Sequence, residues 1–302
     1  MFRYLERGEN STRLLEAGQR ISITHSLQDP SEWISIIDAI GAREAFNNKG
    51  YQYQLTDVIN FMLRDKSNPS SILSTINLAR ENARMIRTAL TREVWEAVNE
   101  AYLLLQKILS RHVTARALPS VLNQIRGQNY AISGALYGTM LRDDIYNFAR
   151  IGTFIERAES TARLLDVKYF VLLPTVSHVG SSLDNAQWES ILLSAAALKS
   201  YSWLFGGNTN PSAIANYLIL DRRMPRSITF SFIELVSNLN LLADSYRATN
   251  PSHMIARDIN KKLVRTDIDS IIQDGLHDFI QDFLKDSNTL GKQIEIDFRF
   301  YE

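Results

Sequence analysis

One charged helical pattern occurs twice in this chain, and the repetition restricts the possible folds more than any other feature. Residues 4–15 (YLERGENSTRLL) and 154–165 (FIERAESTARLL) are 150 positions apart and share six of their twelve residues. The identical pairs are Glu6/Glu156, Arg7/Arg157, Glu9/Glu159, Arg13/Arg163, Leu14/Leu164 and Leu15/Leu165. A repeated leading helix predicts a chain built from two diverged halves.

Further matches in the same order extend the repeat. The matching strings are WISI at Trp33 with WESI at Trp188, and PSSI at Pro69 with PRSI at Pro225. We therefore predict a first helical pseudo-repeat over residues 1–148 and a second over residues 149–302. Because no linker-like stretch separates the halves, we expect them to pack together into one compact domain.

Hydrophobic periodicity predicts helices along almost the whole chain. Apolar side chains recur at helical spacing between residues 151 and 165, and similar stripes begin near Leu73 and Phe232. Four strings place Pro directly after Asp or Asn, which is typical of a helix N-cap followed by proline at the first helical position. These strings are QDPSEW, SNPSSI, TNPSAI and TNPSHM. The predicted fold class is all-α, with a bundle-like body.

The C-terminal residues KQIEIDFRFYE depart from this pattern. Ile294, Ile296, Phe298 and Phe300 alternate with residues that are mostly charged, which is the periodicity of a strand. We therefore predict a short strand-like tail. It either packs against the helical body or offers an edge to a partner or to a second copy of the chain.

Composition argues against several classes of function. Lys and Arg (33) balance Asp and Glu (33), so the net charge attracts neither nucleic acid nor anionic lipid, and we expect neither as a partner. The absence of cysteine excludes disulfides, thiolate metal sites and cysteine nucleophiles. The first residues are too charged for a signal peptide, and the most apolar run, YFVLLPTV, is too short to span a bilayer. We expect a cytoplasmic protein.

The charged residues of the repeated pattern fall on one side of each predicted helix. Glu6, Glu9, Arg13 and Glu16 lie within an arc of about 80° on a helical wheel, beside the apolar stripe, so they should be half-buried. One interpretation is structural, because Glu9 and Glu159 can each pair with the arginine four residues later, Arg13 and Arg163.

The other interpretation is functional. If the two stripes face one another, they line a polar cleft that binds an amine or a cationic peptide, holds Mg²⁺ or Mn²⁺, or performs acid–base chemistry. The candidate ligand-binding residues are Glu6, Arg7, Glu9, Arg13, Glu156, Arg157, Glu159 and Arg163.

No common catalytic signature occurs in the sequence. It has no G-x-S-x-G, Walker loop, G-x-G-x-x-G or H-E-x-x-H string. Neither repeated helix has the Glu-x-x-His string of ferritin-like di-iron proteins; the nearest string, Asp274 to His277, occurs alone. We therefore assign no catalytic residue, no metal ligand and no required cofactor.

A cluster of arginines surrounds Pro225 just before a predicted helix. Arg222, Arg223 and Arg226 are candidate anion-binding residues, because arginines at a helix N-terminus can clamp a phosphate or carboxylate. The structural alternative is that Asp221 pairs with an arginine and fixes the turn.

Four stretches together resemble the bacterial alpha-E family, which is named for its helices and its ER motif. These are YLERGENSTRLLE from Tyr4, LARENARMIRTALTREVWEAVNEAY from Leu78, GTMLRDDIYNFARIGTFIERAESTARLLD from Gly138 and LDRRMPRSI from Leu220. The ER motif falls on Glu6–Arg7 and Glu156–Arg157. The resemblance implies an all-helical protein without an established activity. Fewer residues precede the first ER pair here than is usual in the family, so we expect either a shortened first helix or a start further upstream.

The resemblance also implies partners. Members of the family are typically encoded near ATP-grasp ligase-like proteins and transglutaminase-like peptidases. We therefore expect a non-catalytic helical partner or scaffold of an ATP-grasp-type system that makes or modifies peptides, with a transglutaminase-like protein as a second partner. Two alternatives stay open: an enzyme that uses the acidic cleft on a peptide, and a purely structural oligomer.

Overall fold

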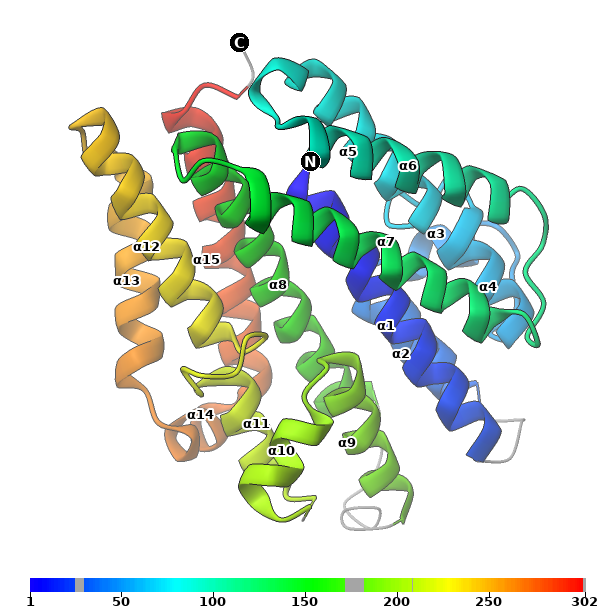
Figure 1. The fold of residues 1–302 in the computed structure, drawn as a ribbon. Coiled ribbons are helices and arrows are strands. Elements are labelled where there is room, and N and C mark those ends of the chain that lie inside the picture. Colours follow the sequence, from blue (N-terminus) through cyan, green and yellow to red (C-terminus); the bar gives the residue numbers. More distant parts are fainter. Residues whose placement is uncertain (25–29, 172–181, 208, 301–302) are drawn as a thin grey trace. The chain divides into compact units, whose positions relative to one another are not determined.

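A computed structural model describes residues 1–24, 30–171, 182–207 and 209–300 of the chain. These residues form fifteen α-helices and one short 3₁₀ helix, with no strand among them (Figure 1). The α-helices are α1 (Phe2–Thr24), α2 (Ser31–Ala39), α3 (Arg43–Asn47), α4 (Leu55–Arg64), α5 (Ile72–Met85), α6 (Arg92–Ile108), α7 (Leu118–Thr139), α8 (Asp144–Val171), α9 (Ser182–Ser194), α10 (Leu198–Phe205), α11 (Pro211–Ile219), α12 (Ile228–Tyr246), α13 (Pro251–Arg265), α14 (Ile268–Asp274) and α15 (Leu276–Asp297). The prediction of an all-α fold is confirmed.

The chain divides into two compact units, Met1–Tyr146 (unit 1) and Asn147–Glu302 (unit 2). The sequence repeat placed the division between residues 148 and 149. That the two halves arose by duplication and form one compact domain stays a prediction.

Unit 1 is built around four helices that pack in a ring. Helix α1 contacts α5 and α7, and α6 contacts the same two helices. Gly8 lets α1 approach α5 closely, since a Cβ added there would lie 3.0 Å from Thr75 Oγ1. Helices α2 and α4 pack beside α1 and bury Ile37, Phe61 and Met62.

Unit 2 has a comparable ring. Helix α13 contacts α12 and α15, and these three helices lie side by side in Figure 1. Helix α8 completes the ring, because Phe154 stacks edge-on against Phe230 of α12 at 6.1 Å and Glu159 is hydrogen-bonded to Ser287 of α15. The core also buries Trp188 of α9.

The four Asp-Pro and Asn-Pro strings differ in what they form. Asn210 and Asn250 are N-caps followed by proline at the start of α11 and α13, as predicted. In SNPSSI the prediction is wrong, because Ser71, and not Asn68, caps α5. The fourth string precedes α2, whose N-cap position is Pro30; the aspartate before it lies outside the described residues.

The strand predicted for the C-terminal tail is wrong. Helix α15 continues through Asp297, with Ile294 buried and Ile296 exposed. A helix satisfies its own backbone groups, whereas a lone strand has no neighbour for its hydrogen bonds. After the helix, Phe298 and Phe300 pack against Phe148 at ring distances of 4.9 and 5.2 Å. The described part of the tail therefore packs against its own unit, and there is no strand edge to offer.

The helices of the described ranges do not meet the requirements for crossing a membrane. None of the helices there combines the length and the apolar composition needed to cross a bilayer.

Candidate functional site

The acidic stripe of α1 is buried beside the core. Glu6 and Glu9 are both more than nine-tenths buried, although they were expected to be only half-buried. They are held on this face by the close packing of α1 at Gly8, whose carbonyl accepts a hydrogen bond from Thr12 Oγ1 at 2.8 Å. Burial of carboxylates is costly without partners, so their contacts decide what the stripe can do.

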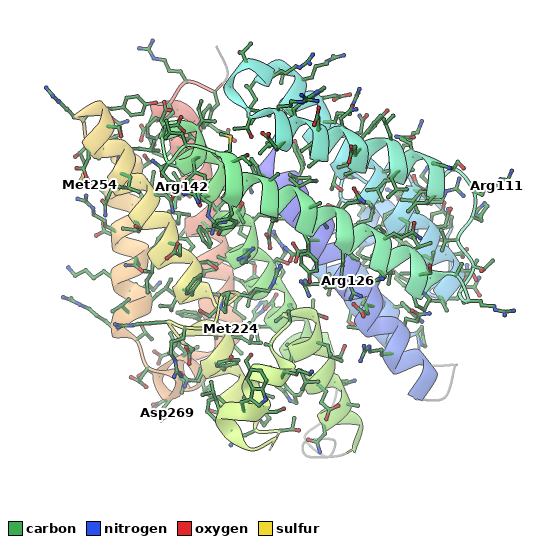
Figure 2. All side chains as sticks on the ribbon, viewed as in Figure 1. Arg111, Arg126, Arg142, Met224, Met254 and Asp269 are labelled. Atoms are coloured by element: carbon green, nitrogen blue, oxygen red, sulfur yellow. The ribbon has the colours of Figure 1, made fainter. Side chains whose placement is uncertain are left out.

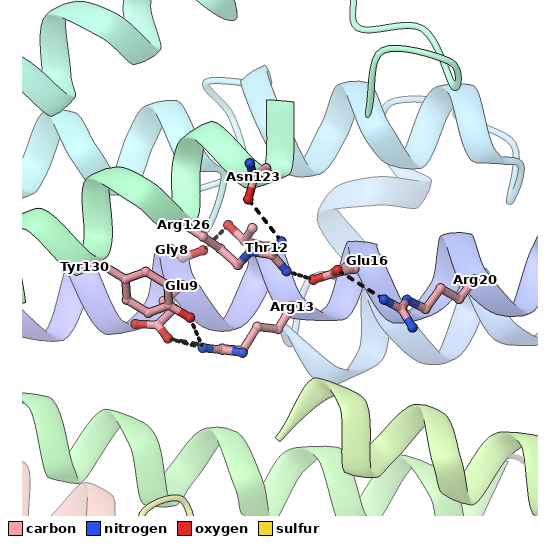
Figure 3. A network of polar contacts seen from close by, with 9 residues as sticks. All are labelled: Gly8, Glu9, Thr12, Arg13, Glu16, Arg20, Asn123, Arg126 and Tyr130. Carbon is pink, nitrogen blue, oxygen red and sulfur yellow. Dashed lines mark hydrogen bonds and ion pairs between the residues drawn. The ribbon is translucent and has the colours of Figure 1, made fainter. Parts of the chain in front are cut away.

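Glu9 forms the centre of a hydrogen-bonded group in unit 1 (Figure 3). Arg13 donates to its Oε1 through Nε at 3.1 Å and through Nη2 at 2.7 Å. Arg13 Nη2 also lies 3.5 Å from the hydroxyl of Tyr130 on α7. Burial opposes the charge of Arg13, but the attraction of Glu9 and the hydrogen bonds to Glu9 and Tyr130 outweigh it and raise the arginine's pKa. The contacts with Glu9 and Tyr130 thus favour the charged form of Arg13.

The stripe continues one further turn along α1 and again meets α7. Arg126 of α7, labelled in Figure 2, forms a close ion pair with Glu16 (Figure 3). Arg126 Nη2 also lies 3.5 Å from Asn123 Oδ1. Arg20 approaches the other oxygen of Glu16 at 3.7 Å. In unit 1 the carboxylates of Glu9 and Glu16 therefore line a polar seam between α1 and α7.

Unit 2 has a similar seam between α8 and α15. Glu159 is buried, and its two oxygens accept from different helices: Arg163 Nη2 donates to Oε2 at 3.1 Å, and Ser287 Oγ donates to Oε1 at 3.0 Å. Glu156 is buried as well. The i,i+4 pairs of the structural interpretation thus form in both units.

The far end of this seam holds an aspartate between two side chains of α15. His277 Nδ1 lies 2.5 Å from Asp166 Oδ1, and Gln281 Nε2 donates to Asp166 Oδ2 at 2.8 Å. Sequence reasoning noted His277 only as part of an isolated string. It missed Tyr130, Arg126, Ser287 and Gln281 altogether, because these partners lie more than one hundred residues from the stripes that they contact.

The arginines of the two ER pairs lie over aromatic rings. The Arg7 guanidinium is 5.9 Å from the centre of the Tyr4 ring, and that of Arg157 is 5.7 Å from the centre of the Phe154 ring. Arg157 Nη1 also donates to the carbonyl oxygen of Pro225 at 3.4 Å. In unit 2 the ER arginine therefore ties α8 to the turn that precedes α12.

That turn contains the arginines proposed to bind an anion. Asp221 accepts from the backbone N–H of Arg223 at 2.7 Å and from its Nη2 at 2.9 Å. Burial alone would raise the pKa of Asp221, but hydrogen bonds and charge from Arg223 lower it. Arg222 and Arg223 are exposed whereas Arg226 is buried, so the three side chains do not share one environment. Asp221 and Arg223 form the pair that the structural alternative predicted for this turn. Anion binding by the arginines stays a prediction.

Unit 1 contains the same kind of turn before α5. Asp65 accepts from the backbone N–H of Ser67 at 2.8 Å, and its own N–H donates to the Asn60 carbonyl at 3.1 Å. The N–H of Asp221 donates likewise to the Asn216 carbonyl at 3.3 Å. Burial opposes the charge of Asp65 too, and hydrogen bonds from Ser67 and Tyr51 overcome it and lower its pKa. The same turn therefore forms in unit 1 without arginines.

Metal binding was one option for the acidic stripes. In the part of the chain that the structure describes, no group of three or more His, Asp or Glu residues is arranged to hold a metal ion. An oxygen-rich Mg²⁺ or Mn²⁺ site would need several such ligands together. The described residues therefore provide no set of ligands for such a site.

Comparison with protein families identifies the chain. The model of Alpha-E, described as a predicted alpha-helical domain with a conserved ER motif, matches residues 1–298. The chain belongs to the Alpha-E family. The two ER pairs of this chain, Glu6–Arg7 and Glu156–Arg157, lie on α1 and α8.

Relatives of this Alpha-E chain occur in mycobacteria. It is 23% identical over 297 residues to the uncharacterized proteins Mb2597 of Mycobacterium bovis and Rv2567 of Mycobacterium tuberculosis. These alignments cover 91% of the chain but only 33% of each relative, so the chain spans about a third of the length of the curated relatives it matches. No solved structure matches it.

Proposed function

We propose that this Alpha-E chain is a non-catalytic helical partner or scaffold of an ATP-grasp-type system that ligates or modifies peptides. The observation that carries the proposal is the internal pairing of Glu9 and Glu159. Each buried carboxylate accepts hydrogen bonds from an arginine of its own helix, and Glu159 accepts a further one from Ser287. Groups bound in this way stabilise a fixed helix arrangement, which suits a scaffold.

The relatives are compatible with this role. In the mycobacterial proteins the matched region is one third of a longer chain. A helical module of that kind can hold other parts of an assembly in place. The partnership with an ATP-grasp-type protein, and with a transglutaminase-like protein, rests on the family resemblance and is the part that an experiment must decide.

The experiment is a pull-down followed by a ligation assay. The full chain, tagged and immobilised, is mixed with a purified ATP-grasp-type ligase from the same organism, and the rate of ATP-dependent amide-bond formation is then measured with and without the chain. We expect complex formation and a changed ligation rate. If the proteins neither bind nor alter ligation, the proposal is wrong.

A double variant separates the scaffold from the enzymatic alternative. Glu156→Gln combined with Glu159→Gln removes both negative charges and preserves side-chain size. We expect the variant to fold and to bind the ATP-grasp protein as the natural chain does, because the docking surface need not include the buried stripe. A folded variant that binds the partner but loses all effect on ligation would favour acid–base chemistry at these carboxylates.

A further inference from the structure

The C-terminal end of α10 carries an exposed apolar surface. Trp203 is 80% exposed, the largest fraction among the exposed large hydrophobic residues of the described chain, and its neighbours Leu204 and Phe205 are 48% and 38% exposed. Exposed aromatic clusters mark binding surfaces more often than single exposed apolar residues do. We call Trp203, Leu204 and Phe205 the Trp203 surface.

The Trp203 surface is held on a rigid base. Tyr201, two residues earlier, is buried and stacks on Phe205 with ring centres 4.7 Å apart. Phe205 also meets the ring of Tyr217 on α11 at 5.8 Å. Gly206 adopts a positive φ of 67° and ends the helix directly after the surface. The indole of Trp203 is therefore presented on an anchored helix.

The corresponding helix end in unit 1 shows that the fold does not require apolar residues here. Ala42 before α3 and Ala197 before α10 are both buried and both donate through their N–H to a carbonyl five residues earlier. Yet α3 ends in polar residues, with Asn47 and Asn48 followed by Lys49. The Trp203 surface therefore has a role other than forming the helix end.

The sequence around the surface is almost free of charge. Between residues 190 and 220, Lys199 is the sole Asp, Glu, Lys or Arg. The matching stretch of unit 1, residues 35–64, carries Asp38, Arg43, Glu44, Lys49, Asp57 and Arg64. Depletion of charge together with exposed aromatic residues is the composition of the centre of a protein–protein interface.

We propose that the Trp203 surface forms a twofold contact between two copies of this chain. In such a contact the same patch faces itself, so any charge on it would meet a like charge. A patch with almost no charge satisfies this condition, and a chain with zero net charge adds no long-range repulsion between copies. An anionic membrane or a nucleic acid would instead require a cluster of basic residues, and this stretch has one lysine.

The first test measures the association of the full chain alone, so its outcome does not depend on the proposed ligase partnership. Sedimentation velocity over a range of concentrations should show a monomer–dimer equilibrium. Trp203→Ser combined with Leu204→Ser should weaken it at least about tenfold, since exposed tryptophans at interface centres carry much of the binding energy. Leu141→Ser, which removes an apolar side chain exposed in unit 1, should leave it unchanged.

The second test uses the absence of natural cysteines. Lys199 lies one helical turn before Trp203 on the same face of α10. The variant Lys199→Cys should be joined into a covalent dimer by a short bismaleimide, and adding Trp203→Ser and Leu204→Ser should abolish the product. Leu103→Cys, on the exposed face of α6, is the matched control and should give none.

Three results would overturn the proposal. One is a natural chain that stays monomeric at about 100 μM, where contacts of micromolar affinity are saturated. Another is a dimer that the paired serine variant leaves intact while the circular dichroism spectrum shows a folded chain. The third is a Trp203 surface that binds phosphatidylcholine–phosphatidylserine vesicles or only a different protein.

Discussion

The two helical units make the same backbone contact with different side chains. In unit 1 the Ser11 hydroxyl of α1 donates to the carbonyl of Ser70, just before α5, at 3.3 Å. In unit 2 the Thr161 hydroxyl of α8 donates to the carbonyl of Arg226, just before α12, at 2.8 Å. The residue that supplies the carbonyl is thus free to change, because only its backbone takes part.

The polar seams of the two units differ more. Helix α7 presents Arg126 to the carboxylate of Glu16 on α1, so two charged groups pair in unit 1. Helix α15 instead presents Ser287 and Gln281, which are neutral donors, together with His277. The comparison shows that the carboxylates of an acidic stripe can be paired either with a charged side chain or with neutral hydrogen-bond donors. It also means that equivalent substitutions should have unequal costs in the two units.

The largest difference in the cost of equivalent substitutions should appear at the aromatic positions Tyr4 and Phe154, which match in the repeat. Phe154 of α8 is fully buried, whereas Tyr4 of α1 is half-buried. We expect Phe154→Ala to lower the free energy of unfolding by about 3–5 kcal/mol through the cavity it leaves. Tyr4→Ala should cost about 1–2 kcal/mol, since less of its area is removed from water. Urea unfolding followed by circular dichroism measures both, and equal losses would mean that the two helices contribute alike.

The next largest difference in stability should come from breaking the ion pairs Glu9–Arg13 and Glu159–Arg163. Arg13 is 11% exposed and Arg163 is 31% exposed, so removing the glutamate leaves a more deeply buried charge in unit 1. We expect Glu9→Ala to destabilise the protein by about 3 kcal/mol and Glu159→Ala by about 1–2 kcal/mol.

A second substitution checks the reason for this difference. In the Glu9→Ala background, Arg13→Ala should cost little further stability or restore some of it, because it removes the unpaired charge. A large additional loss in chemical unfolding would show that Arg13 stabilises unit 1 through contacts other than Glu9.

Acid should weaken both Asp turns. The pKa values of Asp65 and Asp221 are lowered in the folded protein. Their contribution is therefore complete above the unfolded pKa of about 3.9 and is lost as the pH falls through the lower folded pKa. We expect Asp221→Asn to be less stable than the natural chain at pH 7 and similar to it near pH 2. Asp65→Asn should behave in the same way, and a difference that persists at pH 2 would point to an effect other than ionisation.

The smallest effects on stability should come from two backbone positions with positive φ. Gly41 and Ala196 occupy matching corners with φ values of 67° and 53°, a region that costs a residue with a Cβ about 1 kcal/mol. Ala196→Gly should therefore stabilise the protein by about 0.5–1 kcal/mol, and Gly41→Ala should destabilise it by a similar amount. Both sites are exposed, and a Cβ at Gly41 would touch nothing within 4 Å. Thermal melts of the two variants should shift in opposite directions, and shifts of one sign would refute the backbone explanation.

Sequence periodicity determined the parts of this structure that depend on neighbours within one helix. The all-α fold and the pairs Glu9–Arg13 and Glu159–Arg163 follow from spacing alone, because residues four apart on a helix are always close. The placement of the charged stripe beside the apolar one was likewise readable from the sequence. The depth of its burial was underestimated, since a helical wheel does not show how closely other helices approach.

Only the tertiary structure decided the rest. The tail pattern is ambiguous over so short a run, because Leu290, Ile294 and Phe298 also recur every four residues as in a helix; packing of Leu290 and Ile294 in the core selects the helix. The seam partners Arg126 and Ser287 come from helices distant in sequence, and no local spacing encodes which helices meet. The exposure of Trp203 belongs here as well, since sequence marks a tryptophan as apolar but only packing determines whether it is covered.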